Sequence, residues 1–95
     1  MTTIQTVQYL RTKKKLLKKH ALSENNIDIT LDLFKENKEH LSLHYKKMIC
    51  KKDKDRYSIR VLNTQYRILM TVLNDEAFLV CICIHSDYDR INKNC

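Results

Sequence analysis

Two arginines on neighbouring extended segments have the residue type and the spacing to bind an anion. Arg60 lies in the alternating segment 57–62, and Arg67 lies in the next one, 66–73. A tight turn at 63–64 would place the two arginines opposite each other, since Asn tolerates the left-handed backbone of such turns. Like charges opposite each other destabilise a strand pair. The pairing therefore suggests either an anion between the arginines, such as a phosphate or a partner's carboxylate, or two arginines on a solvated face.

A polar cluster follows the last apolar segment, 78–84, and contains His85, Asp87 and Tyr88. Histidine can exchange protons near neutral pH, and a tyrosine can do so when nearby cations lower its pKa. Both residues also have structural alternatives. His85 could satisfy a core hydrogen bond at the end of a buried strand, and Tyr88 could pack at the edge of the sheet.

The charge of the chain restricts its partners. The 95 residues carry a formal net charge of +7, which favours nucleic acid, an anionic membrane or an acidic protein. No apolar segment is long enough to span a bilayer, so we rank nucleic acid first and expect no membrane partner. An exposed aromatic beside lysines is typical of single-stranded RNA binding, although Tyr45 is also a core candidate. The expected RNA-contacting residues are Tyr45, Lys46, Lys47, Lys51, Lys52 and Asp87.

The cysteines predict no metal site. There are four, without a CxxC pair. Cys81, Cys83 and His85 share one face of the last strand, but same-face neighbours lie roughly 7 Å apart, too far for two sulfurs to reach one zinc unaided. We interpret the two cysteines as core thiols and expect no cofactor. The cysteine pattern and the lack of a signal-peptide core at the N-terminus favour a cytoplasmic protein.

Two helices are expected to precede the sheet that carries these residues. The first, 6–20, is basic, and its apolar stripe comprises Val7, Leu10, Leu17 and Ala21, widened by Leu16. The second begins after Ser23, a plausible N-cap. Its inward stripe comprises Ile27, Leu31 and Phe34. Each helix has one apolar face that must be buried.

The whole chain, 1–95, is predicted to be one α+β domain. Four antiparallel strands in meander order are expected at 45–51, 57–62, 66–73 and 78–84, and a short N-terminal strand at 2–6 is a further candidate. The hairpin register pairs Ile59 with Ile68, Val61 with Tyr66 and Tyr57 with Met70 on the face that would receive the helices. The opposite face pairs Ser58 with Leu69 and Arg60 with Arg67.

Short motifs follow one another along this chain in a recognisable order. They are Leu43–Met48 with its Lys-Lys-Met ending, Tyr57–Arg60, Tyr66–Leu69 and the closing run His85–Ile91. Together with length, element order and basic charge, they resemble the RelE/HigB superfamily of bacterial type II toxin–antitoxin toxins. The resemblance extends from Val7 onward, and the closing run is most similar to HigB-like members.

The resemblance implies a metal-independent endoribonuclease that cleaves messenger RNA on the ribosome. A ribose 2′-hydroxyl would attack the adjacent phosphate, which requires positive charge to stabilise the phosphorane and groups that transfer protons. The implied roles are scissile-phosphate binding for Arg60 and Arg67, acid or base catalysis for His85 and Tyr88, and supporting charge from Lys46 and Lys47. Ser58 departs from the lysine that several RelE-like members carry, and Asp87 with Asp89 partly neutralises the site.

A cognate antitoxin is the implied protein partner. An acidic, partly disordered segment that folds on binding would suit a cationic sheet face. Two alternatives on the same fold stay open: a non-catalytic relative that binds nucleic acid or a partner, and a toxin that inhibits DNA gyrase. Fold alone does not decide among them.

Overall fold

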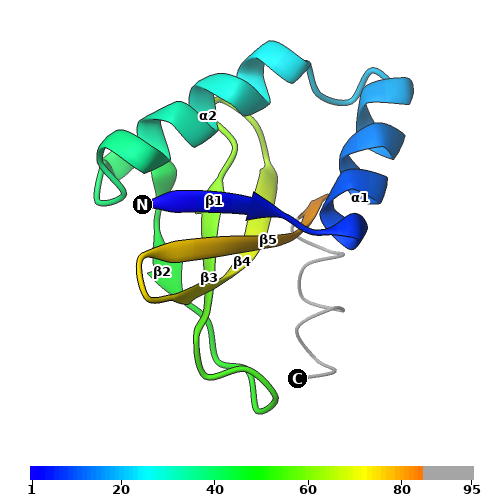
Figure 1. The fold of residues 1–95 in the computed structure, drawn as a ribbon. Coiled ribbons are helices and arrows are strands. Elements are labelled where there is room, and N and C mark those ends of the chain that lie inside the picture. The colour runs from blue at the N-terminus through cyan, green and yellow to red at the C-terminus, as the bar shows by residue number, and fades with distance from the viewer. Residues whose placement is uncertain (85–95) are drawn as a thin grey trace.

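Two helices and five strands make up residues 1–84, the part of the chain that this computed structural model describes (Figure 1). The elements are β1 (Thr2–Gln5), α1 (Val7–Lys18), α2 (Glu24–Glu36), the 3-10 turn η1 (Leu41–Leu43), β2 (Lys46–Lys47), β3 (Arg56–Arg60), β4 (Tyr66–Leu73) and β5 (Glu76–Ile84). The predicted α+β class is confirmed. Neither helix in this range is long and apolar enough to cross a bilayer.

The strands form one sheet in the order β1-β5-β4-β3-β2. The antiparallel meander from β2 to β5 is the predicted one. However, β2 has only two residues, whereas the sequence predicted a strand over 45–51. The candidate N-terminal strand is also present, and β1 lies along β5 in parallel, as Figure 1 shows. The sheet is therefore mixed. No local sequence signal indicated the parallel pair, because β1 and β5 lie at the two ends of the described chain.

The hairpin of β3 and β4 has the predicted register, including Ile59 opposite Ile68 and Arg60 opposite Arg67. Its loop is longer than the predicted two-residue turn. The Val61 amide donates to the Tyr66 carbonyl oxygen at 2.9 Å, so residues 62–65 form the loop. Asn63 takes the expected left-handed backbone, with φ 60°. The alternation of the strands fixes the register even though the turn is wider.

The main core lies between the helices and one face of the sheet. The predicted stripe of α2, Ile27, Leu31 and Phe34, is buried there. Ser23 caps α2 as predicted, because its hydroxyl oxygen accepts a hydrogen bond from the Asn26 amide at 3.1 Å. The hydroxyl of Thr30 accepts a hydrogen bond from the Leu62 amide at 3.1 Å, which attaches the β3–β4 loop to α2.

Helix α1 turns only part of its predicted apolar stripe to the core. Tyr9 is fully buried, whereas Val7 is 67% and Leu10 is 44% exposed. Two hydrogen bonds set this orientation. The Thr6 hydroxyl donates to the Leu79 carbonyl at 2.6 Å, and the Ile82 amide donates to the Thr12 hydroxyl at 3.0 Å. These polar contacts attach one side of α1 to β5. Of the predicted stripe, Leu16 and Leu17 do pack against the core, whereas Val7 and Leu10 face outward.

Candidate functional site

The sheet face opposite the helices is apolar at its centre. Leu69, Cys81 and Cys83 are buried there, with Met48 and Val80 packed against them. Ser58 is also fully buried, and its hydroxyl donates to the Met48 sulfur at 3.6 Å. A lysine at position 58 would lie in this buried place, so the serine agrees with its surroundings. The charged residues predicted for this face therefore lie around an apolar centre.

The thiols of Cys81 and Cys83 are buried and form no disulfide, as the core interpretation predicted. A hydrogen bond with the Cys83 thiol lowers the pKa of Cys81, burial opposes this effect, and the Arg56 charge supports it. Cys50 is buried but disulfide-bonded. Within residues 1–84, no three side chains of the histidine, cysteine and carboxylate types converge as a metal site would require.

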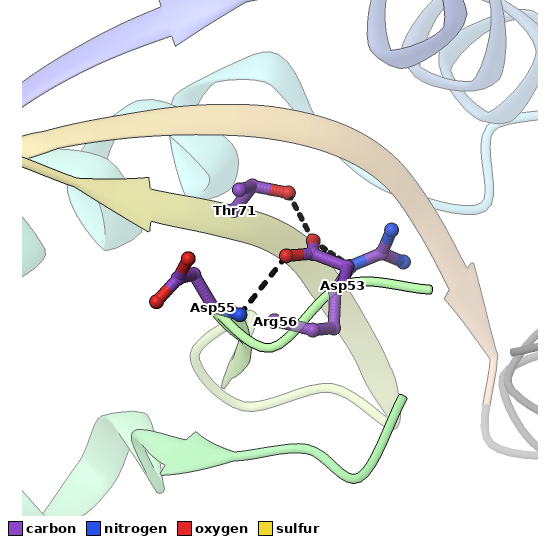
Figure 2. Close-up of polar contacts among 4 residues, drawn as sticks. All are labelled: Asp53, Asp55, Arg56 and Thr71. Carbon is purple, nitrogen blue, oxygen red and sulfur yellow. Dashed lines mark hydrogen bonds and ion pairs between the residues drawn. The ribbon is translucent and has the colours of Figure 1, made fainter. Parts of the chain in front are cut away.

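A partly buried carboxylate, that of Asp53, attaches the β2–β3 connection to β4 (Figure 2). One carboxylate oxygen of Asp53 accepts hydrogen bonds from the Thr71 hydroxyl and from Arg56 Nε, the latter at 3.1 Å. The other oxygen accepts the Asp55 amide at 2.9 Å. Burial alone would raise the pKa of Asp53, but these hydrogen bonds and the Arg56 charge outweigh it and lower the pKa. Arg56 is thus held in a structural ion pair.

Arg60 and Arg67 lie directly opposite each other on adjacent strands, close to the β3–β4 loop. Arg60 Nε donates to the Thr64 carbonyl at 2.7 Å, which holds the guanidinium beside the loop. Arg67 pairs in register with Cys83, and the neighbouring pair is Tyr66 with Ile84. The last described residue of β5 therefore lies one register position from Arg67. This arrangement places two cations together at one end of the sheet.

A cavity of about 400 Å³ opens beside Arg60. It lies where the short β2 leaves the edge of β3 uncovered, since β2 pairs only with Ser58 and Tyr57. The cavity is lined by Leu33, His40, Ser42, His44, Arg60, Leu62 and Asn63. Its walls combine a cation, two imidazoles, a hydroxyl and an amide with two leucines. Such a lining could bind a phosphate and one side of a planar base.

The 3-10 turn η1 positions the two histidines of this cavity. Nδ1 of His40 accepts a hydrogen bond from the Ser42 amide at 3.2 Å and caps the turn. His44 ends the turn with a left-handed backbone, φ 49°. Neither histidine is among the residues that the sequence analysis assigned to the site. Their convergence with Arg60 depends on how η1 lies beside β3, and the spacing His-x-x-x-His alone does not predict it.

The predicted RNA-contacting residues divide into exposed lysines and a packed tyrosine. Lys46 and Lys47 are exposed on β2, and Lys51 and Lys52 are exposed in the turn that follows. The Tyr45 ring stacks on Tyr57, with centroids 5.0 Å apart and planes 8° apart, and it packs against the main core. Burial, followed by Tyr57 and Glu39, raises the pKa of Tyr45 to about 12. Tyr45 therefore packs partly against the core, and its contact with RNA stays a prediction.

Solved structures of toxins share this architecture. The DinJ–YafQ toxin–antitoxin complex from E. coli matches with a TM-score of 0.72 and 14% identity, over 90% of this chain and 92% of that chain. A copper-bound mutant toxin from Helicobacter pylori matches with a TM-score of 0.72 and 16% identity, over 92% and 97% of the respective chains. The RelB–RelE antitoxin–toxin complex from Methanococcus jannaschii matches with a TM-score of 0.62 and 20% identity, over 92% and 96%.

The fold is RelE-like. Identities this low show a common fold and leave the chemistry to be argued from the residues. No family model and no curated protein matches the sequence. The HigB-like subtype was predicted from the closing run 85–91, and that run lies outside the described residues, as do the site candidates His85, Asp87 and Tyr88. Of the residues predicted for the site, the structure describes Arg60, Arg67, Tyr45 and the exposed lysines Lys46, Lys47, Lys51 and Lys52.

Proposed function

We propose that this chain is the toxin of a type II toxin–antitoxin system and that it cleaves messenger RNA. The observation that carries the proposal is the direct opposition of Arg60 and Arg67 beside a polar cavity in a RelE-like fold. Opposed cations destabilise a strand pair unless an anion lies between them. Fork-shaped guanidinium donors suit phosphate, and RNA supplies a phosphate at every nucleotide.

In the proposed reaction, the ribose 2′-hydroxyl attacks the adjacent phosphate and the 5′-oxygen of the next nucleotide leaves. The products are a 2′,3′-cyclic phosphate and a 5′-hydroxyl. Arg60 and Arg67 would stabilise the charge of the phosphorane. His85 and Tyr88 are proposed to take the 2′ proton and to protonate the leaving oxygen. Supporting this, they follow β5 in sequence, and β5 ends one register position from Arg67.

The cavity beside Arg60 is proposed to hold a nucleotide that flanks the scissile phosphate. Its leucines offer an apolar wall to a base, and its imidazoles, hydroxyl and amide offer stacking and hydrogen bonds. Single-stranded RNA is commonly recognised through such contacts to unstacked bases. The exposed Lys46, Lys47, Lys51 and Lys52 would add sequence-independent attraction to the backbone. We propose that cleavage occurs on ribosome-bound messages, where the reading frame is single-stranded.

An antitoxin and a cytoplasmic location complete the proposal. Two of the similar structures are toxin–antitoxin complexes, which supports a cognate antitoxin for this chain as well. The closing run 85–91 supports a HigB-like subtype. A toxin that acts on translating ribosomes would be cytoplasmic. An acidic antitoxin segment would neutralise the basic surface while it is bound.

Expression without an antitoxin should arrest growth and produce cuts within reading frames, mapped by primer extension. We expect Arg67→Ala to reduce cleavage of ribosome-bound message by on the order of 100-fold, because one electrostatic group is lost from the transition state. Arg11→Ala, an exposed arginine on α1, is the matched control and should leave cleavage unchanged. Intact transcripts in arrested cells would refute the nuclease function.

One observation favours a second candidate, a non-catalytic relative that binds nucleic acid or a protein. Position 58 holds a buried serine, and Arg56 is engaged by Asp53, so the sheet face carries less available charge than the resemblance implied. Under this candidate, Arg67→Ala would weaken salt-dependent RNA binding although no variant cleaves RNA. A gyrase-inhibiting toxin would instead cause DNA breaks and leave messages whole.

A further inference from the structure

Helix α1 exposes an apolar stripe that its own core covers only in part. Val7 is 67% exposed, Leu10 is 44% exposed, and Leu17 is only partly buried. Val7 and Leu10 are three residues apart, and Leu10 and Leu17 are seven apart, which places all three on one side of the helix. Lys14 lies between Leu10 and Leu17 in the sequence. The opposite side of the helix, with Tyr9 and Thr12, contacts β5. Leu17 also packs against the core, so the stripe is exposed mainly at Val7 and Leu10, beside the side of the helix that packs against the sheet.

The stripe lies along a groove with strongly basic sides. The groove measures about 700 Å³ and is lined by Leu10, Lys13, Lys14, Leu17 and Lys18. Lys13 Nζ forms an ion pair with Glu24 at 3.3 Å, and the Lys13 side chain is only 13% exposed. Lys13 therefore lies deeper in the groove than the other lysines. Lys14 and Lys18 are exposed beside the leucines. The sequence of α1, VQYLRTKKKLLK, has five cationic residues and no acidic residue.

We propose that this groove docks an acidic amphipathic helix from a partner protein. An apolar seam of such a helix would cover Val7, Leu10 and Leu17, and its glutamates or aspartates would lie against Lys14 and Lys18. Helix-in-groove recognition uses anchors at this spacing, and complementary charge selects the partner and speeds association. The inference does not rest on RNA cleavage, because no residue that lines the Arg60 cavity belongs to α1.

Other occupants fit the same surface less well. A nucleic acid would use the lysines but would leave the apolar stripe in water, because phosphate contacts need no such stripe. A membrane-surface helix usually inserts bulky aromatic anchors, whereas the aromatic residue of α1, Tyr9, is fully buried. A second copy of this helix would bring two cationic faces together. Charge and apolar pattern together therefore select an acidic protein segment.

The test uses a synthetic helical peptide about 20 residues long, since shorter isolated helices are marginal in water. It carries leucines along one seam and glutamates beside them, and binding is measured by fluorescence anisotropy. A second peptide with the same leucines and with lysines in place of the glutamates is the charge control. Anionic phosphatidylglycerol vesicles and a single-stranded RNA are the competing probes, and sedimentation measures self-association.

We expect the acidic peptide to bind and the basic peptide not to bind. Leu10→Gln should weaken binding about tenfold, as loss of one interface anchor does, and so should Lys14→Glu combined with Lys18→Glu, with a larger effect at low salt. Ile29→Gln on α2, where the side chain is 48% exposed, and Lys35→Glu are the matched controls and should bind normally. Circular dichroism would verify that each variant is folded.

Equal binding of the two peptides, or binding that survives Leu10→Gln, would overturn the proposal. The proposal would also be overturned if the acidic peptide fails to bind and if Leu10→Gln abolishes binding to vesicles, binding to RNA or self-association. RNA cleavage is measured on the same variants and should persist in Leu10→Gln. A wild-type protein that binds the peptide but never cleaves RNA would refute the proposed nuclease and leave the docking surface supported.

Discussion

The two faces of the sheet bury their residues in different ways. On the helix side, Ile59, Ile68 and Met70 belong to one continuous apolar core with both helices. On the opposite side, a small cluster around Leu69 is bordered by the ion pair of Asp53 with Arg56 and by the opposed Arg60 and Arg67. The first face stabilises the domain, and the second offers the cations from which a phosphate-binding site can be built.

One strand can contribute to both faces because its side chains alternate between them. Ile68 and Leu69 are neighbours on β4, and both are fully buried, yet they belong to separate clusters. On the sheet face opposite the helices, polar contacts hold the connecting segments where no second apolar layer packs. Asp53, which contacts Thr71, Arg56 and the Asp55 backbone, is the clearest of these.

The largest change in the free energy of unfolding is expected at the two neighbouring residues of β4, Ile68 and Leu69. Ile68→Ala should lower the free energy of unfolding by about 4 kcal/mol, and Leu69→Ala by about 2–3 kcal/mol, because a small cluster can collapse around a cavity more easily than an extensive core. Urea denaturation followed by circular dichroism measures both. Equal losses, or a larger loss for Leu69→Ala, would contradict the proposed difference between the faces.

The next effect tests the polar tether. Asp53→Asn should lower the free energy of unfolding at pH 7 by about 2 kcal/mol, since hydrogen bonds to a charged group are lost from a mostly buried site. Asp55→Asn is the control, because Asp55 uses its backbone and not its carboxylate in the tether. A loss of similar size in both variants would show that the carboxylate of Asp53 has no special role.

The same tether predicts a dependence on pH. The pKa of Asp53 is lowered in the folded state, so the folded state binds this proton less readily than the unfolded state. Its contribution is therefore complete above the ordinary aspartate pKa of about 4 and is lost as pH falls through the lowered value. Asp53→Asn lacks this titrating carboxylate. Its free energy of unfolding should therefore fall less than that of the wild type as the pH is lowered from about 5 to about 1, the range expected for a carboxylate.

The smallest expected effect lies on the helix side. The Tyr9 hydroxyl is buried and has no hydrogen-bond partner among the described residues, and burial followed by the charge of Asp28 raises the pKa of Tyr9 to about 12. Tyr9→Phe should therefore increase the free energy of unfolding by about 1 kcal/mol, since an unsatisfied polar group is removed and the ring is kept. Thermal unfolding measures the change, and a marked destabilisation would show that the hydroxyl has a partner.

Local signals were sufficient for much of the fold. The register of β3 and β4 followed from strand alternation, and the start of α2 followed from its serine cap, because both depend on residues close in sequence. The opposition of Arg60 and Arg67 followed from the same register. Their roles and those of His85 and Tyr88 stay predictions, as does the contribution of the exposed lysines to RNA binding.

Contacts between distant segments decided the rest. The face that α1 buries depends on hydrogen bonds from Thr6 and Thr12 to β5, which no helical periodicity contains. The cavity beside Arg60 depends on where η1 lies relative to the edge of β3. The stacking of Tyr45 on Tyr57 likewise joins two strands. Periodicity identifies which residues share a side of an element, but it does not determine which side meets the core.

The α+β class, the meander, the hairpin register and the strong positive charge could all be predicted from the sequence, because each follows from alternation, capping or composition. Three features could not: that Val7 and Leu10 of α1 face outward, that β1 pairs with β5 in parallel and that two histidines join Arg60 at a cavity. The physical reason is that these features arise from pairings between segments far apart in the chain, whose free energy no single segment contains.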